Sequence, residues 1–189
     1  MRRLAVYCGS SMGTNPRFAE VARALAIEMA ERGIGLVYGG GRLGLMGVVA
    51  DSALEAGGEV HGVIPQALVD LEVAHPGLTE LHLVNTMHER KAMMTELTDA
   101  FVAIPGGIGT LDELFEAWSW NALGYHAKPF ALLNVDGFWD GMISFLDSVT
   151  ANGFMSPARR AQLLVSDGIE DVIDRLDAAI GAAEPKMVW

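Results

Sequence analysis

Pro105-Gly106-Gly107-Ile108-Gly109-Thr110-Leu111-Asp112-Glu113 joins a short apolar run, 101–104, to a periodic helical pattern that begins at Thr110. Its three glycines permit positive φ angles and let a ligand approach the backbone without meeting a Cβ atom. Thr110 is a good candidate for the N-cap of the helix. The first amides of a helix have no acceptor within it and, with the helix dipole, favour an anion. The stretch therefore predicts a phosphate site where a strand turns into a helix.

Glu113 can be interpreted in two ways. It lies three residues after Thr110, so its carboxylate can accept a hydrogen bond from the Thr110 amide in a capping box. Alternatively, the carboxylate faces a ligand whose phosphate rests on the loop amides. The residues of this stretch leave both interpretations open.

Apolar runs alternate with helical patterns along the chain. The predicted strands are 4–8, 35–38, 60–64, 81–84, 100–104, 130–134 and 163–165. The predicted helices are one opened by Pro16 and ended by Gly33, then 45–56, 86–97, 110–123, 138–152 and 169–179. Such alternation indicates a parallel sheet covered on both faces. We therefore expect an α/β fold, a single Rossmann-like domain over 1–189 with a doubly wound parallel sheet of about six or seven strands.

Glycine-rich turns follow three of these strands, after Cys8, Tyr38 and Ile104. Ligands of parallel sheets bind at the carboxyl ends of the strands, so the turns predict one shared site. The second turn, Gly39-x-Gly41-x-x-Gly44, matches the dinucleotide-binding fingerprint. It is not the first strand-to-helix turn, however, and the strand that should supply a ribose-binding carboxylate ends in Pro65. NAD binding is therefore disfavoured relative to a tight turn that packs the strand closely against the helix, or to a wall of another ligand pocket.

Composition narrows the class of protein. Hydrophobic residues make up 51% of the 189 residues and charged residues 20%, as in a folded globular chain. No apolar run approaches the roughly 20 residues of a membrane-spanning helix, so we expect a cytoplasmic protein. The net charge of -11 argues against a nucleic-acid partner. The single cysteine, Cys8, is interpreted as a small buried hydrophobe rather than a nucleophile.

Arg90 and Lys91 lie near the start of the helix predicted at 86–97, whose buried face is marked by Met87, Met94 and Leu97. The helix dipole disfavours cations near the start of a helix, and an anionic ligand bound there would offset that unfavourable interaction. Arg90 offers a planar fork and Lys91 a point charge. A surface salt bridge remains the alternative.

No metal site is predicted. His88-Glu89 begins like a zinc-protease motif, but Ala92 stands where the second histidine must fall. The other histidines, His61, His75, His82 and His126, show no ligand spacing.

Three blocks together resemble the Lonely Guy (LOG) family of cytokinin riboside 5'-monophosphate phosphoribohydrolases. They are Gly39-Gly40-Gly41-x-x-Gly44-Leu45-Met46-Gly47, Met87-His88-x-Arg90-Lys91-x-x-Met94 and Pro105-Gly106-Gly107-x-Gly109-Thr110-x-x-Glu113. The resemblance runs from about residue 4 to about residue 165, with the blocks in the family's order.

The resemblance implies hydrolysis of the N-glycosidic bond of cytokinin nucleotides, and of AMP, to free base and ribose 5-phosphate. It implies that Arg90 and Glu113 are the catalytic pair, that no cofactor or metal is needed, and that the protein is a homodimer whose helices complete each other's pockets. It places further substrate contacts at Glu72 and Gly124. The family's phosphate-binding loop corresponds to Gly106, Gly107, Ile108, Gly109, Thr110, Leu111 and Asp112.

The chain departs from the family at two positions and leaves other functions open. Ile108 stands where the family often has Tyr, and Asp112 where it often has Glu, and both bear on which base is accepted. A nucleotide-binding protein without hydrolysis, similar to the molybdenum-cofactor carriers, is the alternative. The presence of both Arg90 and Glu113 favours the enzyme, because a protein that only binds a nucleotide has no obvious use for a carboxylate beside a phosphate.

Proteins resembling this one are often labelled lysine decarboxylases, which would need a Schiff-base lysine for pyridoxal phosphate. The only lysines are Lys91, Lys128 and Lys186, and no local pattern nominates any of them. We therefore disfavour that label.

Overall fold

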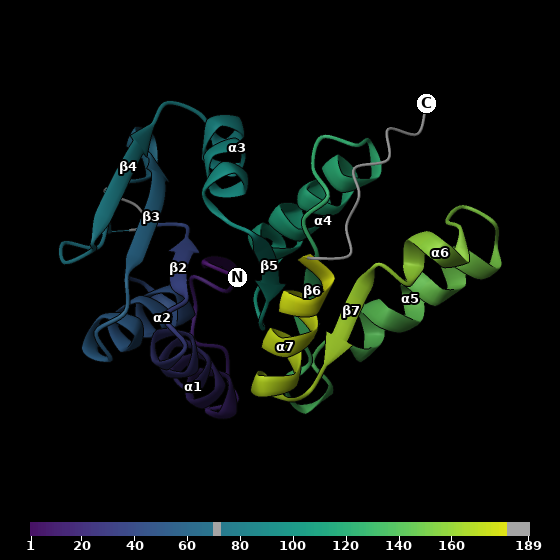
Figure 1. The fold of residues 1–189 in the computed structure, drawn as a ribbon, viewed down its shortest axis with the longest axis horizontal. Helices are drawn as coiled ribbons and strands as arrows, with labels where there is room; N and C mark the ends of the chain where they lie inside the picture. Colours follow the sequence, from purple (N-terminus) through teal and green to yellow (C-terminus); the bar gives the residue numbers. More distant parts are fainter. Residues whose placement is uncertain (70–72, 181–189) are drawn as a thin grey trace.

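The computed structural model describes residues 1–69 and 73–180. A seven-stranded sheet runs across the molecule in the order β4-β3-β2-β1-β5-β6-β7, and each neighbouring pair of strands is parallel (Figure 1). The strands are β1 Arg3–Tyr7, β2 Gly35–Tyr38, β3 Val60–Pro65, β4 Glu80–Val84, β5 Ala100–Ala103, β6 Phe130–Leu133 and β7 Leu163–Ser166. This order confirms the predicted doubly wound α/β fold.

Helices cover both faces of the sheet. They are α1 Arg17–Glu31, α2 Gly44–Glu55, α3 Met87–Leu97, α4 Ile108–Ala122, α5 Asp140–Ala151, α6 Pro157–Arg160 and α7 Ile169–Ile180, with 3-10 turns η1 Gln66–Leu68 and η2 Val135–Gly137. One core joins α1, α2 and α7 to the sheet, and a second joins α3, α4 and α5 to its other face. Within β1, Leu4 and Val6 enter the first core while Ala5 and Tyr7 enter the second. Burial on both faces explains why the strands read as continuous apolar runs.

The start of α4 differs from the sequence prediction. Gly107 is the N-cap, with an extended backbone (φ -98°, ψ -152°), and the helix begins at Ile108 rather than at Thr110. Thr110 therefore lies within the first helical turn and is buried. The capping-box interpretation of Thr110 and Glu113 is wrong, because a residue inside the helix cannot act as its cap.

Two further differences are local. The helix predicted at 138–152 begins at Asp140, because the Asn134 side chain accepts a hydrogen bond from the Trp139 amide (2.8 Å) and holds a turn there. The short helix α6 was not predicted from the sequence. In the part of the chain that the structure describes, no helix combines the length and the apolar character needed to cross a bilayer.

Side-chain hydrogen bonds align the starts of β1 and β5. Oδ2 of Asp99 accepts from the amides of Arg2 (2.6 Å) and Arg3 (2.9 Å). Burial alone would raise the pKa of Asp99, but these two hydrogen bonds outweigh it and bring the pKa below its usual 3.8. The alignment matters because the opposite ends of the same two strands form the site described below.

Asp99→Ala is expected to lower the free energy of unfolding at pH 7 by about 1 kcal/mol, since both amides lose their protein acceptor but can turn to water. The lowered pKa means that the carboxylate stabilises the fold above the unfolded-state pKa and that this contribution is lost as the pH falls through the folded-state pKa. Urea unfolding should show the difference at pH 7 and a smaller one at pH 2.5. Asp174→Ala, which removes a surface partner of Arg32, is the control. An equal loss for Asp99→Ala at both pH values would refute this account.

Candidate functional site

A cavity of about 340 Å³ lies at the carboxyl ends of β1, β2 and β5. Its lining residues are Val6, Cys8, Gly9, Ser10, Gly39, Met46, Met87, Arg90, Gly107, Ile108, Gly109, Thr110, Asp112 and Glu113. A second hollow of about 260 Å³ adjoins it, sharing Gly9, Ser10 and Gly107. The predicted convergence of the three glycine-rich turns is thus confirmed.

The cavity lies where the strand order reverses. From β1 the chain proceeds to β2 on one side, and it returns later to place β5 on the other. The loops after β1 and β5 therefore lead to helices on opposite faces, α1 and α4, and a crevice opens between them. A hydrogen bond from the Gly9 amide to the Pro105 carbonyl (3.1 Å) holds the two loops together at its base.

The first turn of α4 forms one wall of the cavity. The amides of Ile108, Gly109 and Thr110 precede the first intrahelical donor, the Leu111 amide, which bonds the Gly107 carbonyl (3.2 Å). Gly106 permits this geometry, because a Cβ atom there would collide with the Thr110 hydroxyl and lie 2.8 Å from the Gly9 nitrogen. The site therefore presents backbone donors and the positive end of a helix dipole.

Arg90 enters the cavity from α3 and is only 3% exposed. Its Nε donates to the Val63 carbonyl (3.1 Å) and its Nη2 to the Gly39 carbonyl (2.6 Å). A Cβ atom at Gly39 would collide with Nη2, so the glycine after β2 leaves the space that the guanidinium fills. These contacts fix the plane of a buried cation between the ends of β2 and β3.

Glu113 lines the same cavity from the second turn of α4. Its carboxylate is near enough to β1 to act on two side chains there. Burial, and then the charge of Glu113, raises the pKa of the Cys8 thiol, and burial followed by Glu113 and Glu116 raises the pKa of Tyr7. Cys8 is buried, as predicted, and its raised pKa favours the protonated thiol. A carboxylate, rather than a thiolate, is the candidate reactive group.

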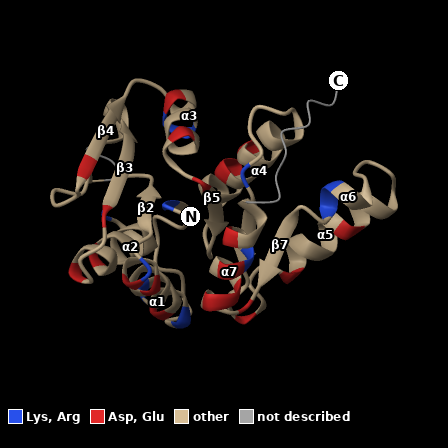
Figure 2. Ribbon diagram, in the orientation of Figure 1, with Lys and Arg blue, Asp and Glu red and all other residues tan. Residues whose placement is uncertain are grey.

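Lys91 does not line the cavity, and its side chain reaches the neighbouring helix α4. Its ammonium pairs with Oδ2 of Asp112 (3.0 Å) and with the Glu116 carboxylate. Figure 2 shows Asp and Glu spread over helices on both faces of the sheet, in keeping with 24 acidic residues against 13 Lys and Arg. Lys91 thus neutralises two of the acidic groups closest to the start of α4.

Other predicted positions lie elsewhere. Gly124 (φ +80°) follows the carboxyl end of α4 and does not line the cavity of its own chain. Leu111 packs against the core under α4, and Glu72 lies outside the described residues. Met87 was predicted on the buried face of its helix, but it is 42% exposed and lines the cavity because it begins α3.

Ser10 and Met46 also line the cavity and were not predicted as site residues, although Met46 belongs to the glycine-rich block that resembles the family. Ser10 lies in the glycine-serine turn after β1, and that turn's position at a strand end was the available signal. Met46 comes to the site through α2, whose Met46 amide donates to the Gly9 carbonyl (3.3 Å). Nothing in the local sequence marks that contact.

A family model described as "possible lysine decarboxylase" matches residues 46–176. The described lysines do not suit that description. Lys91 is held in its ion pairs, the Lys128 ammonium contacts the Thr95 carbonyl, and neither lines the cavity.

The names of similar proteins indicate a different activity from lysine decarboxylation. The "cytokinin riboside 5'-monophosphate phosphoribohydrolase LOG" of Oryza sativa subsp. japonica is 43% identical over 188 residues, which cover 100% of this chain and 78% of that protein. The enzyme of Rhodococcoides fascians with the same description is 43% identical over 173 residues, covering 91% of this chain and 87% of its own.

Among solved structures, the Moco carrier protein from Chlamydomonas reinhardtii matches with a TM-score of 0.72, covering 96% of this chain and 98% of that one. At 21% identity this likeness shows a shared fold alone. The family follows instead from the sequence matches, which extend over nearly the whole chain. The chain belongs to the Lonely Guy family of cytokinin riboside 5'-monophosphate phosphoribohydrolases.

Proposed function

We propose that this chain hydrolyses the N-glycosidic bond of cytokinin riboside 5'-monophosphates and of AMP, releasing the free base and ribose 5-phosphate. The observation that carries the proposal is the presence of the Glu113 carboxylate and the open first turn of α4 in one cavity. A 5'-phosphate on that turn brings the ribose toward Glu113. The activities after which the rice and Rhodococcoides relatives are named agree with this substrate class.

The phosphate would accept hydrogen bonds from the amides of Ile108, Gly109 and Thr110. This mode of binding uses backbone donors and the helix dipole, so it needs no broad basic surface and suits a chain of net charge -11. Lys91 would support it indirectly. By pairing with Asp112 and Glu116, it reduces the negative potential that would otherwise repel the phosphate.

Cleavage of the bond between C1' and the base nitrogen makes the ribose resemble an oxocarbenium ion. The Glu113 carboxylate can stabilise that cation and accept a proton from the water that attacks C1'. The departing base takes the electrons of the broken bond and, in the net balance, the proton that Glu113 removes from water, while the remaining hydroxide becomes the hydroxyl on C1'. Arg90, a fixed cation in the same cavity, can stabilise the negative charge that develops on the base.

We also propose that the protein is a homodimer in which the carboxyl end of α4 reaches the partner's cavity. Leu123 is 66% exposed and Tyr125 is 75% exposed on either side of Gly124. Exposed apolar side chains grouped in this way are typical of an interface. The arrangement would give Gly124 a role in the site that it does not have in its own chain.

Glu113→Gln is expected to lower the rate of base release from N6-isopentenyladenosine monophosphate and from AMP at least 100-fold, since the amide cannot accept the proton of water. Isothermal titration should show that AMP binding is kept. Glu116→Gln is the matched control, because Glu116 lies on the same helix outside the cavity and should keep most of the rate. If the natural chain binds AMP but releases no base from either nucleotide, the hydrolase proposal fails, and a binding or carrier function replaces it.

Gly106→Ala is expected to weaken binding of ribose 5-phosphate more than tenfold, because the new Cβ displaces Thr110 and the Gly9 loop. Gly141→Ala should change binding less than twofold, since Gly141 lies in α5 away from the cavity, no atom lies within 4 Å of a Cβ built there and alanine suits a helix. Both affinities can be measured by titration, with thermal unfolding as a check on folding. Equal affinities for the two variants would argue against a phosphate on this turn.

The dimer can be tested by analytical ultracentrifugation of the natural chain and of Leu123→Glu. The substitution buries a charge in the proposed interface, so the variant should sediment as a monomer at micromolar concentration. Phe154→Ser, at an exposed position between α5 and α6, should stay dimeric. A monomeric natural chain under these conditions would contradict the dimer.

A further inference from the structure

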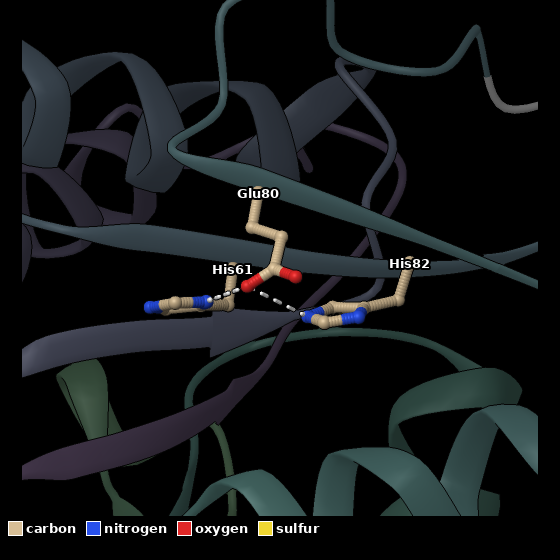
Figure 3. Close-up of side chains that lie close together, drawn as sticks. All are labelled: His61, Glu80 and His82. Atoms are coloured by element: carbon tan, nitrogen blue, oxygen red, sulfur yellow. Dashed lines mark ion pairs between the residues drawn. The ribbon is translucent and has the colours of Figure 1, made fainter.

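His61, Glu80 and His82 meet on the face of the sheet that α3 covers (Figure 3). The strand register brings them together, because His61 of β3 lies opposite Glu80 of β4 and His82 lies opposite Val63. All three side chains therefore point to the same side of two adjacent parallel strands. The sequence analysis predicted no metal site because the spacing between the two histidines follows no local motif.

Three of the four ring nitrogens of the two histidines are buried without a hydrogen-bond partner in the described part of the chain. His61 is 4% exposed, and within residues 1–69 and 73–180 neither of its ring nitrogens has a hydrogen-bond partner. The same holds for Nε2 of His82. Their nearest carboxylate oxygens are 3.5–3.6 Å away, in positions that do not make hydrogen bonds. Buried ring nitrogens without partners are costly, so a ligand that engages them would stabilise the fold.

The spacing of the three groups fits a metal ion. Oε2 of Glu80 lies 3.5 Å from Nδ1 of His61 and 3.5 Å from Nε2 of His82, and ligand atoms of the three residues all lie within 4.8 Å of one another. Tetrahedral zinc with bonds of about 2.0–2.1 Å separates its ligand atoms by about 3.3 Å. A small rotation of the exposed Glu80 side chain and of His82 would complete that geometry.

We propose that His61, Glu80 and His82 bind a zinc-type divalent transition-metal ion. Two imidazoles and one carboxylate favour zinc, nickel or copper, whereas magnesium and calcium prefer oxygen ligands. Nδ1 of His61, Nε2 of His82 and a Glu80 oxygen are the ligands, and water takes the fourth position. The side chain of Glu80 is 57% exposed, so that position opens toward solvent.

Glu59 supplies the second carboxylate that such a site requires. Its Oε2 lies 3.6 Å from Nε2 of His61, the ring nitrogen that faces away from Glu80. When Nδ1 binds the metal, Nε2 carries the proton and can donate it to Glu59. A carboxylate that holds the distal nitrogen of a metal-binding histidine fixes its tautomer and raises its basicity.

The site would be structural and separate from the nucleotide cavity. His61 is the second residue of β3 and Glu80 the first of β4, whereas the nucleotide cavity lies at the carboxyl ends of the strands. The edge strand β4 pairs only with β3 within the sheet. A metal ion bound by both strands would fasten that edge to the rest of the sheet.

The test uses the full chain, freed of any affinity tag and of bound metal by a chelator. Zinc chloride binding is measured by calorimetry, and cobalt chloride binding by visible absorption. One ion per chain is expected, with the cobalt spectrum of a tetrahedral site. Thermal unfolding should shift upward by roughly 5–10 °C at a zinc concentration about 100 times Kd. Magnesium chloride should produce no shift.

Substitutions test which residues bind the metal ion. The double variant His61→Val and His82→Val, which places β-branched residues suited to strands at both positions, should lose stoichiometric binding. Glu59→Gln should weaken it about 10–100-fold, and His88→Ala, an exposed histidine elsewhere, should bind as the natural chain does. If the double variant does not fold, Glu80→Gln at its exposed position serves instead, with at least a tenfold loss expected. The proposal is overturned if the natural chain binds no zinc stoichiometrically, or if the double variant or Glu80→Gln binds zinc as tightly as the natural chain does.

Discussion

The pairing of β1 with strands on both sides is the constraint on which the rest of the structure depends. Because the strand order reverses at β1, with β2 on one side and β5 on the other, the helices that follow β1 and β5 lie on opposite faces of the sheet, and a crevice opens at the carboxyl end of β1. The bonds from Asp99 to the start of β1, and from Gly9 to Pro105 at its end, keep that register at both ends. The position of the cavity follows from topology before any reactive residue is considered.

Close approach of backbone segments then decides which groups reach the crevice. Gly39 leaves room for the Arg90 guanidinium, and Gly106 lets the first turn of α4 lie against the Gly9 loop. A larger residue at either position would separate elements that carry the site. The result is a small region of backbone donors and one buried cation in an otherwise acidic protein, which suits a single phosphate rather than a nucleic acid.

The sequence predicted most of this arrangement because its signals were local. Apolar runs and glycine turns located the strands, and the three turns at strand ends located the cavity. The capping box at Thr110 failed because the backbone of Gly107, which no side-chain pattern specifies, begins the helix earlier. The contacts of Met46, and the meeting of His61 with His82, depend on strand register and helix placement, which are long-range properties that a single sequence does not display.

The central claim is that a nucleotide binds with its phosphate on the first turn of α4 and its sugar beside Glu113. The most direct measurement is a crystal structure of the Glu113→Gln variant soaked with AMP, which should remain intact. The account predicts phosphate oxygens within hydrogen-bond distance of the amides of Ile108, Gly109 and Thr110, and C1' of the ribose next to the side chain at position 113. A nucleotide bound in the reverse direction, or at another site, would contradict it.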